Sequence, residues 1–324
     1  MISKIKWGII GPGKIANKFA EALSNVEGAE LYAVASRSEV TAKTFAQKYN
    51  APVYYGSYEA LVKDALVDII YVATPHAFHK DATLLCLNNN KSVLCEKPLA
   101  HKYEDVKVMI EASIANNVFM MEAMWTRFLP PIEKALAIIN SGQIGELRGV
   151  TADFGFNSPF DPKSRLYDMA LGGGSLLDVG VYPLFLALTI LGEPNEIKAS
   201  ANLSETGADK DCTIKLKYPY AEGFVFSSIV SDTKREASIV GTKGTIIFNT
   251  PWYRQTSIRL ELKDGTTQKF DFNYSGNGFE PQILEAMNCL SNVTIESALM
   301  PHRFSLLQSK VLDQICNQCG IHYA

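Results

Sequence analysis

The chain has 324 residues, about twice the usual size of one domain, so we expect two domains. Hydrophobic residues make up 47% of the chain and charged residues 20%, a balance that excludes disordered and fibrous proteins. The formal net charge is −3, and no basic stripe is present that could neutralise a run of phosphates. Nucleic acid is therefore not an expected partner.

The sequence also gives an expectation about the cellular compartment. Residues 1–7 lead into a strand-like segment without the long apolar stretch of a signal peptide, and the longest apolar run, residues 181–191, is too short to span a bilayer. The six cysteines are scattered over a long chain, which favours reduced thiols. We expect a cytoplasmic protein without a membrane segment.

The first part of the chain alternates short apolar runs with amphipathic stretches, which is typical of βαβ units on a parallel sheet. Predicted strands cover residues 6–10, 31–35, 68–73, 92–95 and 118–121, and predicted helices cover residues 14–24, 40–49, 79–88 and 103–116. We therefore expect residues 1–123 to form an α/β Rossmann domain with a doubly wound parallel sheet.

After residue 124 the predicted strands follow one another with hairpin spacing. They cover residues 147–156, 196–203, 212–217, 223–230, 237–240, 245–249, 257–262 and 268–272, with helices at 132–140 and 176–191. We expect residues 124–324 to form an α+β domain with a large, mostly antiparallel open sheet. A closing helix at residues 304–318 is a candidate to pack on the first domain.

The first predicted strand ends in a glycine-rich loop, and the residues of this loop are Gly11, Pro12, Gly13, Lys14, Ile15 and Ala16. In a G-x-G-x-x-A pattern the first glycine makes a tight turn, the second lets the backbone approach a pyrophosphate, and the alanine lets the helix pack closely. The helix N-terminus adds N–H groups and a positive dipole end. We favour a dinucleotide site over the alternative of a plain glycine turn.

The second predicted strand ends in Ser36, Arg37 and Ser38 instead of the carboxylate that binds the ribose 2′-hydroxyl of NAD. A guanidinium pairs with a 2′-phosphate and stacks on adenine, and serine hydroxyls add hydrogen bonds. We therefore predict NADP(H) as the preferred cofactor and keep NAD(H) as the alternative. The competing interpretation is an arginine that is merely solvated at a strand end.

Several motifs together resemble the glucose-fructose oxidoreductase/inositol dehydrogenase family of NAD(P)-dependent oxidoreductases. They are the Gly11–Ala16 loop, Thr74-Pro75 with His76 and His79, Cys95-Glu96-Lys97-Pro98, and the glycine-rich segment 172–182. The resemblance covers essentially the whole chain, and Glu96-Lys97-Pro98 is its most specific part. Segments 121–128 and 145–148, with Tyr182, resemble the dimeric dihydrodiol dehydrogenases, which also oxidise D-xylose.

Lys97 is catalytic by this resemblance. Independently, a lysine before a proline at the carboxyl edge of a parallel strand lies where open α/β sheets bind ligands, and its ammonium can hold a substrate oxygen as charge develops. The alternative is a surface lysine paired with Glu96. The resemblance places Glu96 and Lys97 on the cofactor side, together with Thr74, Pro75, His76 and His79.

Asp178 and Tyr182 are four residues apart in a helical pattern and so project from one face. A tyrosine hydroxyl near Lys97 can give a proton to a carbonyl or take one from an alcohol. The alternative is a core tyrosine with an aspartate in the first helical turn. Many relatives carry histidine at the Tyr182 position, so whether Tyr182 or Lys97 transfers the proton stays open.

No metal site is predicted. His76 and His79 lack a set of carboxylate or cysteine partners, and Cys316 and Cys319 are a lone pair at a helix end. For His79 we weigh a cofactor-side role against a solvent-facing residue at a helix start.

An aromatic and cationic set follows the domain crossover and is expected to line the substrate site by stacking on a ring and by binding its hydroxyls. For each aromatic, core packing is the alternative. The set comprises Trp125, Arg127, Phe128, Arg148, Phe154, Phe156 and Tyr167, with Trp252 and Phe279 as further members.

Phe224, Phe226, Ile229 and Val230 place apolar groups on both faces of one strand of the second domain, so something must cover its outer face. We predict a homodimer through this open sheet, as in the family. The expected activity is NADP(H)-dependent hydride transfer to or from a sugar, polyol or trans-dihydrodiol. The alternatives are a non-catalytic NADP-binding regulator and an NAD-dependent inositol or sugar dehydrogenase.

Overall fold

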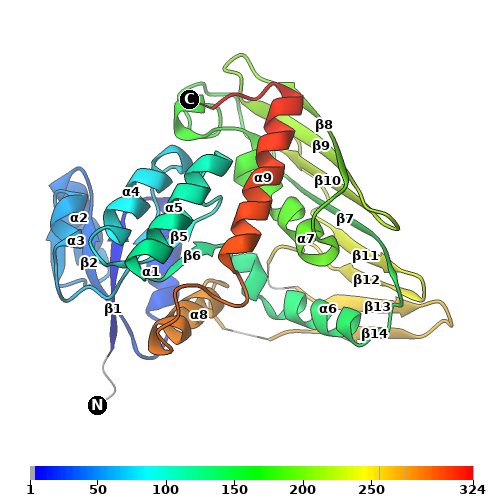
Figure 1. The fold of residues 1–324 in the computed structure, drawn as a ribbon, viewed down its shortest axis with the longest axis horizontal. Helices are drawn as coiled ribbons and strands as arrows, with labels where there is room; N and C mark the ends of the chain where they lie inside the picture. The colour runs from blue at the N-terminus through cyan, green and yellow to red at the C-terminus, as the bar shows by residue number, and fades with distance from the viewer. Residues whose placement is uncertain (1–3, 255, 274, 324) are drawn as a thin grey trace. The chain divides into compact units, whose positions relative to one another are not determined.

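The computed structural model describes residues 4–254, 256–273 and 275–323 and divides into two compact units (Figure 1). The first unit comprises Met1–Trp125 and Ser275–Ser309, and the second comprises Thr126–Tyr274 and Lys310–Ala324. The first crossing of the chain lies close to the predicted boundary at residue 123. Residues 275–309, however, belong to the first unit and not to the second domain, where the sequence pattern had placed them.

Hydrogen bonds explain why this later segment joins the first unit. The Asn277 side chain donates to the Lys18 carbonyl over 2.8 Å, and the Asn25 side chain donates to Glu280 over 3.2 Å. These contacts tie the start of helix α8 (Glu280–Ser291) to the chain around helix α1 (Lys14–Leu23). Residues so far apart in sequence give no local signal of this association.

The first unit contains a six-stranded parallel sheet in the order β3-β2-β1-β4-β5-β6, which confirms the Rossmann prediction. Its strands are β1 (Ile5–Ile10), β2 (Ala29–Ala35), β3 (Val53–Tyr55), β4 (Ile69–Val72), β5 (Ser92–Glu96) and β6 (Met120–Ala123). Its other helices are α2 (Glu39–Lys48), α3 (Tyr58–Val62), α4 (His79–Leu87) and α5 (Tyr103–Asn116). The strand order reverses between β1 and β4, and ligands of such sheets bind at the carboxyl ends of these strands.

Strand β3, helix α3 and helix α8 were not predicted from the sequence. Strand β3 has three residues and helix α3 has five, which is too short for a hydrophobic period to become visible.

A buried aromatic stack fixes α1 on the sheet. The ring centroid of Phe19 lies 3.7 Å from that of Tyr71 and 5.3 Å from that of Trp7.

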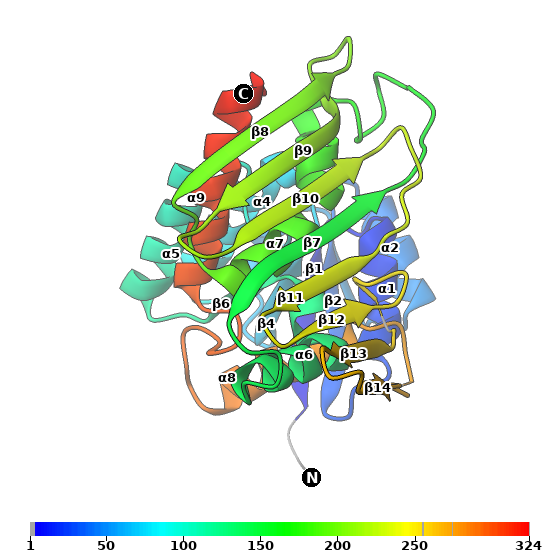
Figure 2. The same cartoon turned by 90° about the vertical axis from the view of Figure 1, so that its right-hand side faces the viewer.

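The second unit contains an eight-stranded sheet in the order β14-β13-β12-β11-β7-β10-β9-β8 (Figure 2). Its strands are β7 (Leu147–Gly155), β8 (Glu196–Leu203), β9 (Asp209–Lys217), β10 (Glu222–Ser228), β11 (Ala237–Gly241), β12 (Gly244–Phe248), β13 (Ile258–Leu262) and β14 (Thr267–Phe270). Strands β7 and β10 pair in parallel and the other neighbours pair antiparallel, which confirms the predicted mostly antiparallel sheet.

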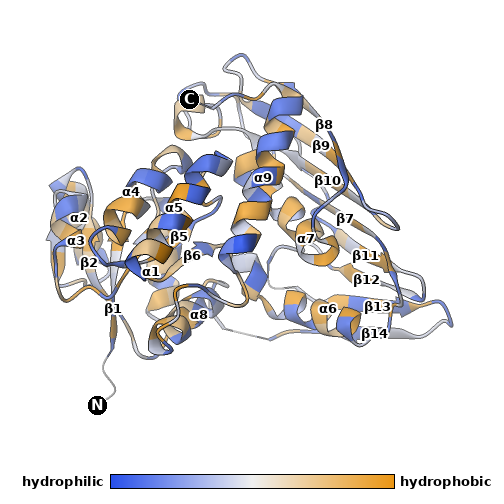
Figure 3. Cartoon of the chain, viewed as in Figure 1, coloured by the Kyte–Doolittle hydropathy of each residue, from blue (hydrophilic) through white to orange (hydrophobic). Residues whose placement is uncertain are grey.

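The helices of the second unit are α6 (Pro130–Asn140), α7 (Val181–Leu191) and the last part of α9 (His302–Cys319). Residues Leu176–Gly180 form a π-helical turn that continues into α7. The stretch Met169–Leu191 is long and apolar enough to cross a membrane by length and composition, and 83% of its most apolar window is buried inside the protein. Helix α7 is accordingly apolar around most of its surface, as expected of a core helix (Figure 3).

Candidate active site

The glycine-rich loop joins β1 to α1 and has the features of a phosphate cradle. Gly11 has a φ of +82°, and a Cβ atom there would lie 2.9 Å from the backbone of Ala73 and Thr74, so no side chain fits. Helix α1 begins after Gly13 without a side-chain cap and without an acidic residue in its first turn. Its first N–H groups therefore suit an anionic ligand. Ala16 is fully buried and allows close packing, while Gly13 and Lys14 are exposed.

The carboxyl end of β4 adds an orphaned polar atom beside this loop. Thr74 is 7% exposed, and its hydroxyl oxygen is buried without a hydrogen-bond partner among the described residues. A buried hydroxyl without a hydrogen bond lowers the stability of the folded protein unless a bound ligand supplies that hydrogen bond. The loop and Thr74 together fit a dinucleotide, since both lie at the carboxyl ends of β1 and β4.

Residues 36–38 connect β2 to α2 and carry the expected cofactor-selecting group. The Ser38 hydroxyl accepts from the Thr41 N–H over 3.4 Å as the N-cap of α2, and the Ser36 hydroxyl accepts from the Ser38 N–H over 3.3 Å. The Arg37 guanidinium carbon lies 5.5 Å from the ring centroid of Phe78, which is 37% exposed. Phe78 was not predicted from the sequence, because its approach to Arg37 bridges two loops.

The Glu96-Lys97-Pro98 corner follows the end of β5, and all three residues are buried. The Glu96 carboxylate accepts from the Tyr71 hydroxyl and from the Lys97 backbone N–H, the latter over 3.2 Å. Glu96 therefore braces the backbone of the corner. The Lys97 side chain is 9% exposed, so the alternative of an exposed surface lysine does not hold.

Glu122 on β6 supports the same corner from behind and was missing from the predicted site. Its carboxylate accepts from the Leu99 N–H over 3.1 Å, from the Ser305 hydroxyl over 2.5 Å and from the Gln308 amide over 3.2 Å. Burial raises its pKa to about 7, although these hydrogen bonds oppose the shift. No sequence signal marks it, since two of its partners lie on α9.

His79 begins α4 and is fully buried, which excludes the solvent-facing interpretation. Its Nδ1 lies 2.9 Å from the Pro98 carbonyl oxygen and its Nε2 lies 2.9 Å from the Thr74 carbonyl oxygen. Burial lowers the pKa of the imidazole to about 4, and the two carbonyls counteract that shift. His79 thus links the end of β4 to the Pro98 turn. The half-exposed ring of His76 lies beside it, with the two ring centroids 5.6 Å apart.

In the second unit, Asp178 lies within the π-helical turn and Tyr182 in the first turn of α7. Tyr182 is 7% exposed and Asp178 is 8% exposed. Arg165 donates to the Asp178 carboxylate over 2.8 Å, and its own side chain is 57% exposed. Arg165 belongs to a long irregular connection, so the sequence gave no reason to single it out. π-Helical turns of this kind occur often at functional sites.

An aromatic cluster surrounds Tyr182 within the same unit. Phe154 stacks on Tyr253 with ring centroids 3.8 Å apart, and Tyr182 lies 5.6 Å from Phe154 and 5.8 Å from Tyr253. Tyr253 was not predicted, although its neighbour Trp252 was. A ring-shaped substrate can stack on such a cluster.

The other predicted aromatics have different surroundings. Trp252 is fully buried, and its indole N–H donates to the Asp153 carbonyl over 2.8 Å, as in a core residue. Tyr167 is fully buried against Val179 and Ile229, with Phe156 packed on that group.

The remaining members of the predicted set lie on either side of the boundary between the units. In the first unit, Trp125 stacks on Phe279 with ring centroids 5.2 Å apart. Phe128 is buried, and Arg127 pairs with Glu133 over 3.2 Å.

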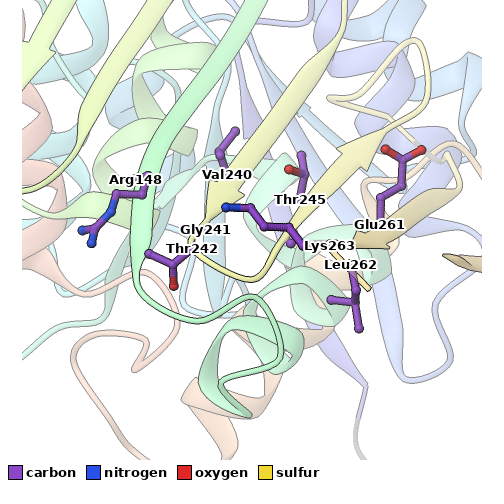
Figure 4. A pocket seen from close by; sticks show the side chains of 9 residues that line it. Arg148, Val240, Gly241, Thr242, Thr245, Glu261, Leu262 and Lys263 are labelled. Carbon is purple, nitrogen blue, oxygen red and sulfur yellow. The ribbon is translucent and has the colours of Figure 1, made fainter. Parts of the chain in front are cut away.

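Arg148 lies apart from the aromatic cluster, at the opposite end of β7. Phe154 is six positions further along the strand, which corresponds to a distance of about 20 Å. Its guanidinium pairs with Glu146 over 2.7 Å and lines a hollow of about 410 Å³ near the β11–β12 turn, together with Val240, Thr242 and Lys263 (Figure 4). The placement of Arg148 therefore does not support the predicted role in holding substrate beside Tyr182.

Residues 5–123 match the family described as "Oxidoreductase family, NAD-binding Rossmann fold", and residues 132–247 match the "GFO/IDH/MocA C-terminal domain". The chain is 37% identical over 331 residues to a Xenopus tropicalis protein named Trans-1,2-dihydrobenzene-1,2-diol dehydrogenase, covering 98% of this chain and 99% of that protein. The chain belongs to the GFO/IDH/MocA family. The family resemblance predicted from the Glu96-Lys97-Pro98 and glycine-rich motifs is thus confirmed.

Three further proteins are similar to this chain. The Mus musculus protein of the same name is 35% identical over 329 residues, with 98% of both chains covered. The solved structure of aldose-aldose oxidoreductase from Caulobacter crescentus, complexed with glycerol, matches with a TM-score of 0.89 at 25% identity over 98% of both chains. A 3-ketoreductase from Actinomadura kijaniata, crystallised with NADP and TDP-benzene, shares the fold with a TM-score of 0.88 at 23% identity over 98% of both chains. The protein is an NAD(P)-binding oxidoreductase.

Among the described residues, no group of three or more His, Cys, Asp or Glu side chains is arranged to hold a metal ion. The candidate residues of this GFO/IDH/MocA oxidoreductase fall into two sets, and the first set, which comprises Gly11, Arg37, Thr74 and Lys97, lies in the first unit. A second set, Asp178 and Tyr182 with their aromatic neighbours, lies in the second unit.

Proposed function

We propose that the protein is an NADP(H)-dependent oxidoreductase that interconverts a secondary alcohol and a carbonyl on a sugar, polyol or trans-dihydrodiol. The names of the relatives support this substrate class, because they include a dihydrodiol dehydrogenase and an aldose-aldose oxidoreductase. The Phe154–Tyr253 stack beside Tyr182 also suits a ring-shaped substrate. When bound, NADP(H) supplies or accepts the hydride.

The observation that carries this proposal is the buried corner at Lys97. Its backbone is braced by Glu96, which accepts from the Lys97 N–H, and by Glu122, which accepts from the Leu99 N–H. A side chain at this edge of a doubly wound sheet faces the region where ligands bind. In our proposal the Lys97 ammonium holds the substrate oxygen and stabilises the charge that develops on it.

Tyr182 is proposed to transfer the proton at the substrate oxygen, with Asp178 beside it. The two side chains are one helical turn apart, and the Asp178 carboxylate is held by Arg165 over 2.8 Å. A tyrosine needs a neighbouring positive charge to act as an acid or base near neutral pH, because its unperturbed pKa is about 10. In our proposal the charge of the Lys97 ammonium at the substrate oxygen favours this proton transfer.

The proposed preference for NADP(H) depends on Arg37. Its guanidinium lies beside the exposed Phe78 ring, so a nucleotide base and a 2′-phosphate can share this cation. No carboxylate occupies the end of β2, where NAD-binding domains carry one, since residues 36–38 are Ser-Arg-Ser.

The decisive experiment for the function is Lys97→Met, with Lys102→Met as the matched control on an exposed neighbouring lysine. We expect Lys97→Met to lower kcat by about 1,000-fold or more in a screen of sugars, polyols and dihydrodiols with NADP⁺. NADPH binding, followed by fluorescence, stays within about threefold of wild type, because the phosphate cradle does not involve this side chain. A fully active Lys97→Met enzyme contradicts the proposal, and a wild-type protein that binds NADPH but turns over no substrate favours a binding protein.

We also propose that two copies pair through the outer face of the eight-stranded sheet. Phe224 is 44% exposed and Val240 is 38% exposed on that face, and the Lys215 ammonium lies 4.8 Å from the Phe224 ring centroid. Light scattering should give a dimer mass for the wild type and a monomer mass for Phe224→Glu. A monomeric wild type at micromolar concentration contradicts this pairing.

A further inference from the structure

Asp209 is a buried carboxylate with no role in the proposed chemistry so far. It begins β9, is fully buried, and lies in the same unit as Asp178 and Tyr182. One carboxylate oxygen, Oδ2, accepts from the Leu176 N–H over 2.8 Å and from the Ser175 hydroxyl over 2.6 Å. The other, Oδ1, has no partner among the described residues. Burying a carboxylate costs free energy, so a buried aspartate at this position needs a compensating role.

A β-bulge turns the Asp209 side chain inward. Cys212, Ile214 and Leu216 alternate into the core along β9, and strict continuation of this period would point residue 209 outward. The register shifts between the pairs Asn202–Asp211 and Leu203–Asp209, which inserts one extra residue and reverses the side of Asp209. Bulges of this kind re-aim side chains and occur often next to active sites.

The group that Asp209 holds is the beginning of the helical segment that carries Asp178 and Tyr182. Ser175 precedes the π-helical turn, and its side chain makes no capping hydrogen bond to this segment. Asp209 supplies the missing cap from a neighbouring strand by accepting from the Leu176 N–H. A carboxylate at this end also suits the helix dipole.

Two further contacts fix the same segment against the sheet. The Ser175 hydroxyl lies 2.9 Å from that of Ser227 on β10. A Cβ atom on Gly180 would lie 2.8 Å from the Ser227 hydroxyl, so the segment touches the strand directly. A Cβ atom on Gly174, which has a φ of +117°, would lie 2.0 Å from Asp209 Oδ1, so the last glycine of the Gly172–Gly174 run leaves room for this carboxylate.

We propose that Asp209 is a positioning residue for catalysis: it caps and anchors the helical segment, and thereby sets where the Tyr182 hydroxyl lies. This inference depends on the proposed role of Tyr182. Asp209 does not touch the substrate in this scheme and acts through the helix.

The test compares Asp209→Ala with Asp209→Asn and uses Asp211→Ala as the matched control. Asparagine keeps an oxygen that accepts both capping bonds, whereas alanine removes it. Asp211 lies on the same strand and accepts from Asn202 at the surface. We expect Asp209→Ala to lower kcat by about 10- to 100-fold, because small displacements of a catalytic group have effects of this size. We expect Asp209→Asn to stay within about threefold of wild type and Asp211→Ala within about twofold, with NADPH affinity unchanged in all three.

A double-mutant cycle with Tyr182→Phe separates positioning from a general structural role. If Asp209 acts through Tyr182, Asp209→Ala causes no further loss of kcat in the Tyr182→Phe background. The inference is overturned if the kcat loss of the double mutant equals the product of the losses of the two single mutants. It is also overturned if Asp209→Ala keeps the wild-type kcat. If Asp209→Ala does not fold, Ser175→Ala takes its place in the same cycle, since it removes one donor to the same carboxylate. A Tyr182→Phe enzyme with wild-type kcat instead refutes the part of the proposed function that gives the proton transfer to Tyr182, so the two failures are distinguishable.

Discussion

Replacing Glu122 by glutamine tests the buried carboxylate behind the Lys97 corner. Burial raises the pKa of Glu122 from its usual 4.5 to about 7 in the folded protein. Between these two pH values the folded protein retains a proton that the unfolded chain has lost, so the stability contributed by this group falls as pH rises. Glutamine does not titrate, and the variant lacks this decline.

The magnitude follows from the two pKa values. Between pH 5 and pH 8, Glu122 lowers the free energy of unfolding by about 2 to 3 kcal/mol in the wild type. Glutamine can keep the contacts, because its oxygen accepts from the Leu99 N–H and the Ser305 hydroxyl can accept from its NH₂ group. We therefore expect the unfolding free energy of Glu122→Gln to rise by about 2 to 3 kcal/mol relative to that of the wild type when the pH is raised from 5 to 8.

Amide hydrogen exchange of β5 and β6, measured by mass spectrometry at both pH values, reports the opening free energy of the first unit. The comparison is between wild type and variant at each pH, so other titrating groups, including His79, cancel. Glu133→Gln on α6, whose carboxylate is half exposed, serves as the control for the replacement of a glutamate by glutamine outside the buried corner. If the difference between wild type and Glu122→Gln is the same at pH 5 and pH 8, the folded-state pKa of Glu122 is not raised.

Three further substitutions probe the cofactor site, the aromatic cluster and the core. Arg37→Asp should raise the KM for NADPH by about 30-fold or more and change the KM for NADH far less. The control Lys43→Asp on α2 should leave the ratio of these two KM values unchanged. Equal effects of Arg37→Asp on both KM values exclude a role of Arg37 in binding the 2′-phosphate. Phe154→Ala should raise the substrate KM by about tenfold in steady-state assays, whereas Arg148→Ala, at the other end of β7, should leave it unchanged. A larger effect of Arg148→Ala than of Phe154→Ala contradicts the assignment of the aromatic cluster to the substrate site. Trp252→Phe should lower unfolding free energy by about 2 to 3 kcal/mol in denaturant titrations, because it leaves the Asp153 carbonyl unpaired. Trp7→Phe should cost less, since the described residues offer its indole N–H no partner.

The sequence by itself determined the parts of this protein that depend on local pattern. The β1–loop–α1 unit, the absence of a carboxylate at residues 36–38 and the Lys97-Pro98 pair are visible within a few neighbouring residues. Apart from the three-residue strand β3, the strands of both sheets were predicted within a few residues, because their apolar periods and turn residues act locally. The one-turn spacing of Asp178 and Tyr182 was predicted as well, although the segment begins as a π-helical turn.

Only the tertiary structure decided which polar groups support that framework. Glu122 gains its role from partners on α9, and Asp209 gains its role from a bulge and a distant helix start. Tertiary packing also brought residues 275–309 into the first unit. Burial and hydrogen bonding between residues far apart in the chain depend on packing, for which a local period carries no information. Chain length predicted two domains, and the motifs implied an oxidoreductase by resemblance to a family, but the bracing of the candidate catalytic groups became visible only in three dimensions.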